Sequence, residues 1–220
     1  MTGVPVYNVN NNCATGSTAL HLAKNFVQGG VYDCVMALGF EKMERGSLSM
    51  KYPDRTNPLD KTFLKSEELM KVEGNPPFAP RLFGNAGIEH MKLYGTKPEH
   101  FAKIAAKNHK HSLNNPYSQF QKGFTLDQVQ KAPQIHGILT KLQCCPTSDG
   151  AGCAIICNEK FMLDHGLQDQ AVEIVAMELT TDVPKMFDSN IELVGYSMTR
   201  NAAEKVYEKS GVKPEEIGVV

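Results

Sequence analysis

The stretch VPVYNVNNNCATGSTALHLAKNFVQGGVYDCVMALG, residues 4–39, decides the fold class of this 220-residue chain. Three valines in its first six residues favour a β-strand, and the asparagine run at 10–12 ends that strand. Apolar residues then recur at helical spacing until two glycines stop the helix at 29–30. Residues 34–39 are almost wholly apolar, which is typical of a strand buried on both faces of a parallel sheet. The stretch therefore predicts a βαβ unit and, with it, an α/β fold.

The middle of the chain, residues 46–140, is predicted to be a mostly helical insertion. One short helix is expected near 65–72 and another near 82–91. A third begins after Thr96, because Glu99 three residues later completes a capping-box pattern. We expect these helices to form a loop domain that follows the first core portion, residues 1–45.

Residues 141–220 return to alternating strands and helices. Residues 151–157 and 172–179 are predicted strands, and residues 200–209 are a predicted helix. Residues 217–220 have the character of a strand that is only beginning. We therefore expect this part to hold the remainder of the first core and the start of a second, truncated core.

Composition excludes several classes of function. Lysine and arginine together number 23 against 24 acidic residues, a formal net charge of −1, so no strong field of one sign is available to bind nucleic acid or an anionic membrane. No apolar run approaches the roughly 20 residues that span a bilayer. The six cysteines are too sparse for a disulfide scaffold and lack zinc-ligand spacing. We expect no membrane span, no bound metal and a reducing compartment.

Cys13 is the strongest candidate for a catalytic residue. It lies between the predicted strand and the predicted helix, among small residues that allow a sharp turn and a close approach of substrate. A thiol there faces unpaired backbone N–H groups and the positive end of the helix dipole, which favour the nucleophilic thiolate. A packing role fits its position equally well, because free cysteine is a common small core residue.

Other polar residues carry weaker signals. His109 and His111 lie near a helix end, where histidine commonly faces backbone carbonyl groups. Cys145 lies beside a turn at residues 147–150 and is a candidate to line a pocket, whereas Ser148 is most simply part of that turn. No glycine-rich nucleotide loop and no His-Glu-x-x-His stretch occurs, so nucleotide binding and zinc proteolysis lose their main support.

The residues around Cys13, NNNCATGSTA at 10–19, resemble the nucleophile segment of thiolases. The resemblance extends to ALGFEKM at 37–43, NPYSQF at 115–120 and LQCCPTSDGA at 142–151. It runs from residue 4 to residue 220 and is closest to the peroxisomal 3-oxoacyl-CoA thiolases of the sterol carrier protein x type.

The resemblance implies an acyltransferase of lipid β-oxidation that cleaves 3-oxoacyl-CoA with free coenzyme A as co-substrate and uses no other cofactor. It implies that Cys13 is the acylated nucleophile and that the loop domain covers the acyl-CoA. Phe83, Cys145 and Ser148 are the residues that it places beside the substrate. It also implies a homo-oligomer, a dimer formed through the core sheet, and a peroxisomal location.

The chain also departs from the thiolase pattern. Neither a Gly-His-Pro stretch, which carries the histidine that activates the nucleophile, nor a His-Asp-Cys-Phe stretch occurs in the 220 residues. Because such catalytic residues act as a unit, we expect this chain alone to show no thiolytic turnover. The alternative is a non-catalytic module that binds acyl-CoA, lipid or another subunit. A ketosynthase-like condensing enzyme ranks last because of the NPYSQF stretch.

Overall fold

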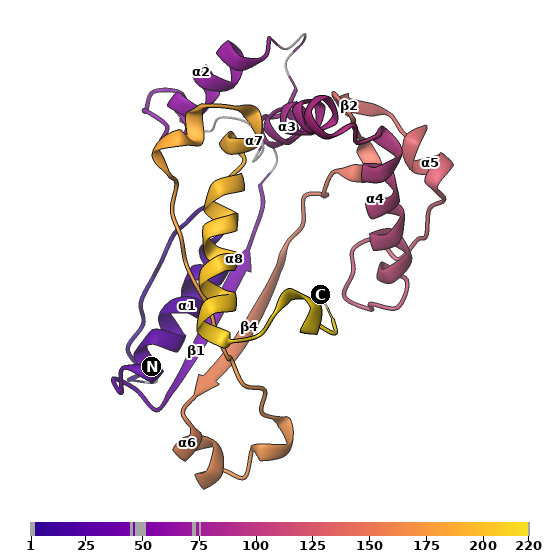
Figure 1. Ribbon diagram of the computed structural model, residues 1–220. Coiled ribbons are helices and arrows are strands. Elements are labelled where there is room, and N and C mark those ends of the chain that lie inside the picture. Colours follow the sequence, from indigo (N-terminus) through magenta and orange to yellow (C-terminus); the bar gives the residue numbers. More distant parts are fainter. Residues whose placement is uncertain (1–2, 45, 47–51, 72–73, 75, 220) are drawn as a thin grey trace. The chain divides into compact units, whose positions relative to one another are not determined.

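The computed structural model describes residues 3–219 except 45, 47–51, 72–73 and 75. The chain divides into two compact units, each of which is assembled from separate segments. The first unit contains residues 1–42, 149–181 and 200–220, and the second contains residues 43–148 and 182–199. Figure 1 shows the helices and strands in the order in which they follow along the chain.

The first unit is built on a two-stranded antiparallel sheet. β1 (Cys34–Glu41) pairs with β4 (Gly150–Cys157) over the whole length of both strands, so that Cys34 lies opposite Cys157 and Glu41 opposite Gly150. The two strands run side by side with helix α1 (Thr15–Gln28) alongside them (Figure 1). The unit is completed by α6 (Glu159–Asp164), the short helical turns η2 (Gln168–Gln170) and η4 (Pro214–Glu216), and the part of α8 (Tyr196–Ser210) that begins at Arg200.

One face of this sheet packs against α1 and the other does not. Ala37 of β1 and Ala23 of α1 are buried. A Cβ atom added at Gly39 would lie 3.9 Å from the Cα of Gly16, so the strand and the start of the helix approach closely because both residues lack side chains. The alternate residues of β1, by contrast, point away from α1, and Phe40 among them is 78% exposed.

The strands differ from the sequence prediction in partner and direction. Residues 3–10 are not in a sheet, and Val4 and Val6 are exposed, so the predicted first strand of the βαβ unit is wrong. β1 lies in an antiparallel pair with one exposed face rather than in a parallel sheet buried on both faces. Residues 172–179 are not a strand, nor are residues 217–219 of the stretch predicted at 217–220, whose last residue lies outside the described residues. The strand predicted at 151–157 is confirmed as β4. An apolar run forms a strand only where it meets a partner.

The second unit is mostly helical. Its main helices are α2 (Asp60–Leu69), α3 (Phe78–Tyr94) and α4 (Pro98–Ser112), and α3 confirms the helix predicted near 82–91. The smaller elements are α5 (Leu126–Gln130), β2 (Gln134–His136), β3 (Leu139–Thr140), η1 (Lys141–Gln143), η3 (Pro184–Phe187) and α7 (Asn190–Leu193). Val129 and Ala102 are fully or almost fully buried in this unit.

Helix α4 begins at a different residue from the one that its capping-box pattern predicted. Its N-cap residue is Lys97, and the helix then starts with Pro98, whose fixed φ suits a first helical position. The Thr96 hydroxyl instead forms a hydrogen bond of 2.9 Å with Nδ1 of His90 on α3. The Thr96 hydroxyl, which the sequence pattern assigned to the helix cap, is therefore used in a tertiary contact with α3.

A polar network in the interior of the second unit joins α2, α3 and β2. Nε2 of His136 donates to the Asn85 side-chain oxygen at 2.8 Å, and the Asn85 amide donates to the Ser66 hydroxyl at 3.4 Å. Asn85 and Ser66 are fully buried. Burial, followed by the nearby charge of Arg81, lowers the pKa of His136 below its ordinary value of 6.5. Folding therefore disfavours the protonated form of His136.

We predict that this network makes the second unit less stable in mild acid. The unfolded chain binds a proton at His136 more tightly than the folded chain does, so the free energy of unfolding decreases as the pH falls below about 6.5. In His136→Gln, whose amide can still donate to Asn85, the urea midpoint should fall less between about pH 7.5 and about pH 5.5. His111→Gln, at the exposed end of α4, is the control and should keep the dependence of the native chain. An equal dependence in His136→Gln would refute the assignment.

Candidate active site

Cys13 follows a tight turn that the asparagine run builds. Among the residues that the structure describes, Asn12 is the only non-glycine residue with a left-handed backbone, at φ 48°. Asparagine tolerates this conformation better than most residues because its short side chain can bond to nearby backbone. Here the Asn10 side-chain oxygen accepts from the N–H of Asn12 at 3.1 Å. The turn therefore reverses the chain just before the candidate nucleophile.

Thr15 and Thr18 connect this turn to the first residues of α1. The Thr15 hydroxyl donates to the Asn12 carbonyl at 2.7 Å and accepts from the Asn11 N–H at 2.9 Å. The Asn11 amide side chain donates to the Thr18 hydroxyl at 3.0 Å. Asn11 and Asn12 thus both bond to residues of α1, and these contacts hold the chain on either side of Cys13 in place.

Cys13 is exposed and directly precedes Ala14, the N-cap residue of α1. Its sulfur lies 3.7 Å from the Asn12 side-chain oxygen, within the range of a weak S–H hydrogen bond. The N–H groups of Gly16 and Ser17 belong to the first turn of the helix, where helix geometry supplies no acceptor. With the positive end of the helix dipole, these groups are suited to stabilise negative charge on a group that reacts at Cys13.

We predict that position 12 is sensitive to the shape of its side chain. Asn12→Val places a β-branched residue in the left-handed region, which should lower the free energy of unfolding by about 1–2 kcal/mol. Asn12→Gly should be tolerated far better, because glycine adopts positive φ without steric cost. Urea unfolding of the two variants measures the difference. Equal stability of both variants would show that the turn is not conformationally constrained.

The other three predicted site residues lie in the second unit. Phe83, on α3, has 58% of its surface exposed. Cys145 is exposed and follows the half-buried Cys144, whose pKa is raised by burial and then by its neighbour. The Ser148 hydroxyl donates to the side-chain oxygen of Gln119. Phe83 therefore comes from α3, whereas Cys145 and Ser148 come from the segment after η1. Their contact with substrate stays a prediction.

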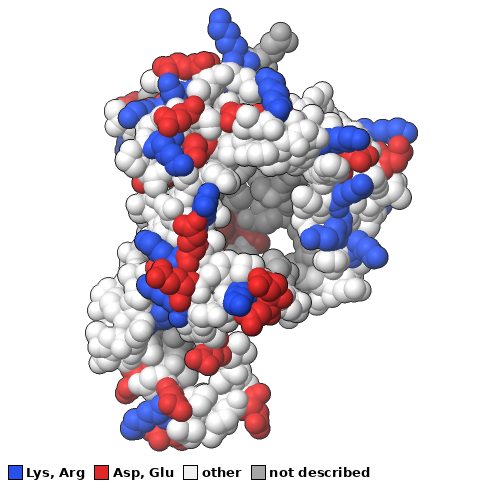
Figure 2. All heavy atoms as spheres, viewed as in Figure 1, with Lys and Arg blue, Asp and Glu red and all other residues white. Residues whose placement is uncertain are grey.

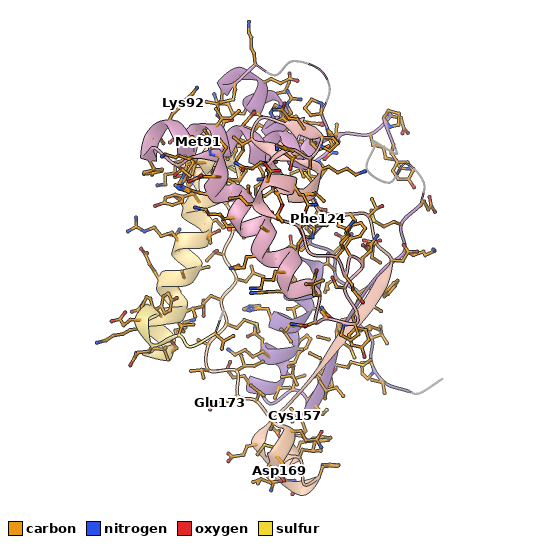
Figure 3. The ribbon with its side chains drawn as sticks, turned by 90° about the vertical axis from the view of Figure 1, so that its right-hand side faces the viewer. Met91, Lys92, Phe124, Cys157, Asp169 and Glu173 are labelled. Atoms are coloured by element: carbon orange, nitrogen blue, oxygen red, sulfur yellow. The ribbon has the colours of Figure 1, made fainter. Side chains whose placement is uncertain are left out.

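The segment that contains Cys145 and Ser148 is held by two other stretches of the second unit. Gln119, from the NPYSQF stretch, also donates to the Thr147 carbonyl at 3.4 Å. His109 donates from Nε2 to the Leu142 carbonyl at 2.9 Å. Its ring meets that of Phe124, which is labelled in Figure 3, edge-on at 4.9 Å. His109 therefore helps to position this segment. The sequence partly predicted this role, because histidine near a helix end commonly faces a backbone carbonyl group.

Two further polar side chains, His21 and Arg81, bond to partners outside these groups. His21 on α1 bonds through Nε2 to the Asn25 amide at 3.0 Å. Arg81, with a side chain that is largely buried, pairs with Glu67 at 2.7 Å. No sequence motif indicated that Thr15 and Thr18 hold the turn before Cys13. Their spacing after the asparagine run was the only indication of that role.

The face shown in Figure 2 bears no concentrated charge of one sign, and the described residues form no metal-binding cluster. Basic and acidic side chains are intermixed on the face shown in Figure 2. No group of three or more histidine, cysteine or acidic residues among the described residues is arranged to hold a metal ion. Within the same residues, no helix has both the length and the apolar character needed to cross a bilayer.

The family follows from comparison with known proteins. The model of the thiolase N-terminal domain matches residues 1–125. The chain belongs to the thiolase family. Sterol carrier protein 2 of Rattus norvegicus is 58% identical, over all of this chain and 40% of that protein. Acetyl-CoA acetyltransferase of Methanothermobacter thermautotrophicus is 28% identical, over all of this chain and 54% of that protein. The chain thus spans about two fifths to about half of the length of these relatives.

A solved structure confirms the fold class. The Ltp2-ChsH2(DUF35) aldolase superposes on this chain with a TM-score of 0.68 at 18% identity, and the match covers 93% of this chain and 51% of that chain. The α/β architecture predicted from residues 4–39 is therefore correct at the level of the fold, although individual strands differ. The thiolase resemblance that the motifs carried is likewise confirmed.

Proposed function

We propose that this chain carries the acyl-accepting part of a 3-oxoacyl-CoA thiolase and that Cys13 is its nucleophile. The observation that carries the proposal is the exposed Cys13 thiol at the start of α1, on a turn held by Asn11, Asn12 and Thr15. Exposure allows a thioester to reach the sulfur, and the helix N-terminus favours the negative charge that develops there. Membership of the thiolase family supports this chemistry.

In the proposed reaction the Cys13 thiolate attacks the 3-keto carbon of a 3-oxoacyl-CoA. The bond between C2 and C3 breaks, the enolate of the released acyl-CoA takes up a proton, and the shortened acyl group remains on sulfur as a thioester. The thiol of free CoA then attacks that thioester and releases Cys13. Gly39 and Gly16 contribute by allowing the sheet to approach the start of the helix closely.

The second unit is proposed to bind the CoA thioester. Phe83 supplies an exposed aromatic surface for an acyl chain, and Cys145 and Ser148 lie together on one segment that Gln119 holds. We also propose that the chain acts in lipid β-oxidation in peroxisomes, and its 58% identity to sterol carrier protein 2 supports this. Assembly as a homodimer is proposed on the family alone.

Acyl capture tests this proposal. After incubation of the chain with acetyl-CoA, peptide mass mapping should find one acetyl group on Cys13 and none on that peptide in Cys13→Ser. Cys153→Ser, which removes an exposed cysteine of β4, is the matched control and should be acetylated as the native chain is. Acetyl groups spread evenly over the exposed cysteines would contradict the role of Cys13.

Turnover is measured separately. With acetoacetyl-CoA and CoA, we expect the 220-residue chain to consume no substrate, because it lacks the Gly-His-Pro stretch that would supply the activating histidine. Steady consumption of acetoacetyl-CoA that disappears in Cys13→Ser would contradict the expected lack of turnover. It would still support Cys13 as the nucleophile. Equal, non-covalent binding of acetyl-CoA by the native chain and Cys13→Ser, without acetylation, would favour the alternative of a binding module.

A further inference from the structure

Two cysteines from distant parts of the sequence lie directly opposite each other in the sheet of the first unit. Cys34 begins β1, Cys157 ends β4, and the antiparallel register makes them partners. Cys157 lies where β4 leads into α6 (Figure 3). Both residues are half-buried and both are free thiols. Nothing in the proposed acyl transfer uses either of them.

The hydrogen-bond pattern next to this pair fixes its geometry. The Asn158 N–H donates to the Asp33 carbonyl at 3.0 Å, so the residues just outside the pair form a hydrogen-bonded pair. Hydrogen-bonded and non-hydrogen-bonded pairs alternate along an antiparallel ladder, and Cys34 with Cys157 is therefore a non-hydrogen-bonded pair. Such pairs have Cα atoms about 4.5 Å apart and side chains on the same face, a separation within the range that disulfides span.

The electrostatics and hydrogen bonds around the pair reflect how close the two cysteines are. Burial and, after it, the charge of a Cys157 thiolate raise the pKa of Cys34. A further contact, in which the Asn158 amide donates to the Asp33 carboxylate at 2.7 Å, holds the strand ends together beside the cysteines. Cys153, the other cysteine of β4, lies opposite Leu38 and has no cysteine across from it.

We propose that Cys34 and Cys157 are a redox modification site that closes to a disulfide when a hydroperoxide oxidises it. The thiolate of one cysteine attacks the peroxide, the O–O bond breaks, and a sulfenic acid forms with release of water or an alcohol. The sulfur of the other cysteine then attacks the sulfenic sulfur, the S–S bond forms, and the sulfenic oxygen leaves as water. Each cysteine loses its proton and one electron, and a small dithiol reverses the reaction by exchange.

The bond would join two segments that are distant along the chain. β1 comes from residues 1–42 of the first unit and β4 from residues 149–181. A cross-link between them restricts the unfolded chain strongly because the loop it closes is long. Oxidation is therefore expected to make the first unit more resistant to denaturant without any change in the folded register.

The test treats the native 220-residue chain with hydrogen peroxide, blocks the remaining thiols with iodoacetamide and maps peptides without reduction. The expected result is one dominant disulfide, between the peptides of Cys34 and Cys157, which disappears after dithiothreitol. Oxidised chain should also unfold at a higher urea concentration than reduced chain. Because the map uses the native protein, it decides the matter even if a variant fails to fold.

Variants give the matched comparison. Cys34→Ser and Cys157→Ser should each lose the disulfide and the shift in urea midpoint, whereas Cys153→Ser should keep both. Cys13→Ser should also keep both, which separates this proposal from the role of Cys13 in acyl transfer. Full alkylation of Cys34 and Cys157 after peroxide treatment that oxidises other cysteines would overturn the proposal, as would disulfides distributed among all cysteines alike.

Discussion

The antiparallel pairing of β1 with β4 is the constraint on which the first unit depends. It joins two of the three segments of that unit, and it decides which side of each strand meets α1. Ala37 and Gly39 face the helix, whereas Leu38 and Phe40 face away from it. A shift of register by one residue would exchange these faces and bring large side chains against Gly16 at the start of α1. The close approach that positions the Cys13 turn would then be lost.

Cys13 lies in a different environment from the pair Cys34 and Cys157, and this difference separates their chemistry. Cys13 is exposed, precedes a helix N-terminus and follows a tight turn, an arrangement suited to attack on a thioester. Cys34 and Cys157 are half-buried and paired across strands, an arrangement suited to attack on each other. The sequence already singled out Cys13 by its position, but the pairing of Cys34 with Cys157 became evident only from the register of the strands.

Local signals predicted the helices better than the strands, although the helix expected near 65–72 forms at Asp60–Leu69 as α2. The helix after Cys13 was predicted from apolar spacing and closing glycines, both of which act within one segment, and α1 confirms it. Residues 4–9 carry β-favouring valines, yet they lie outside the sheet. Thr96 matched a local cap but bonds to His90. The buried contact between His136 and Asn85 joins residues far apart in the chain, and no local pattern could predict it.

The sequence by itself determined the α/β class, the α1 helix with its glycine stop, the family and the candidate nucleophile, because each rests on neighbouring residues or on a contiguous motif. Only the tertiary structure decided the antiparallel partner of β1, the exposed face of the sheet, the hydrogen bonds that shape the turn before Cys13 and the pairing of Cys34 with Cys157. These features depend on which distant segments meet, and a strand acquires its partner, direction and faces only when its backbone hydrogen bonds find acceptors in another segment.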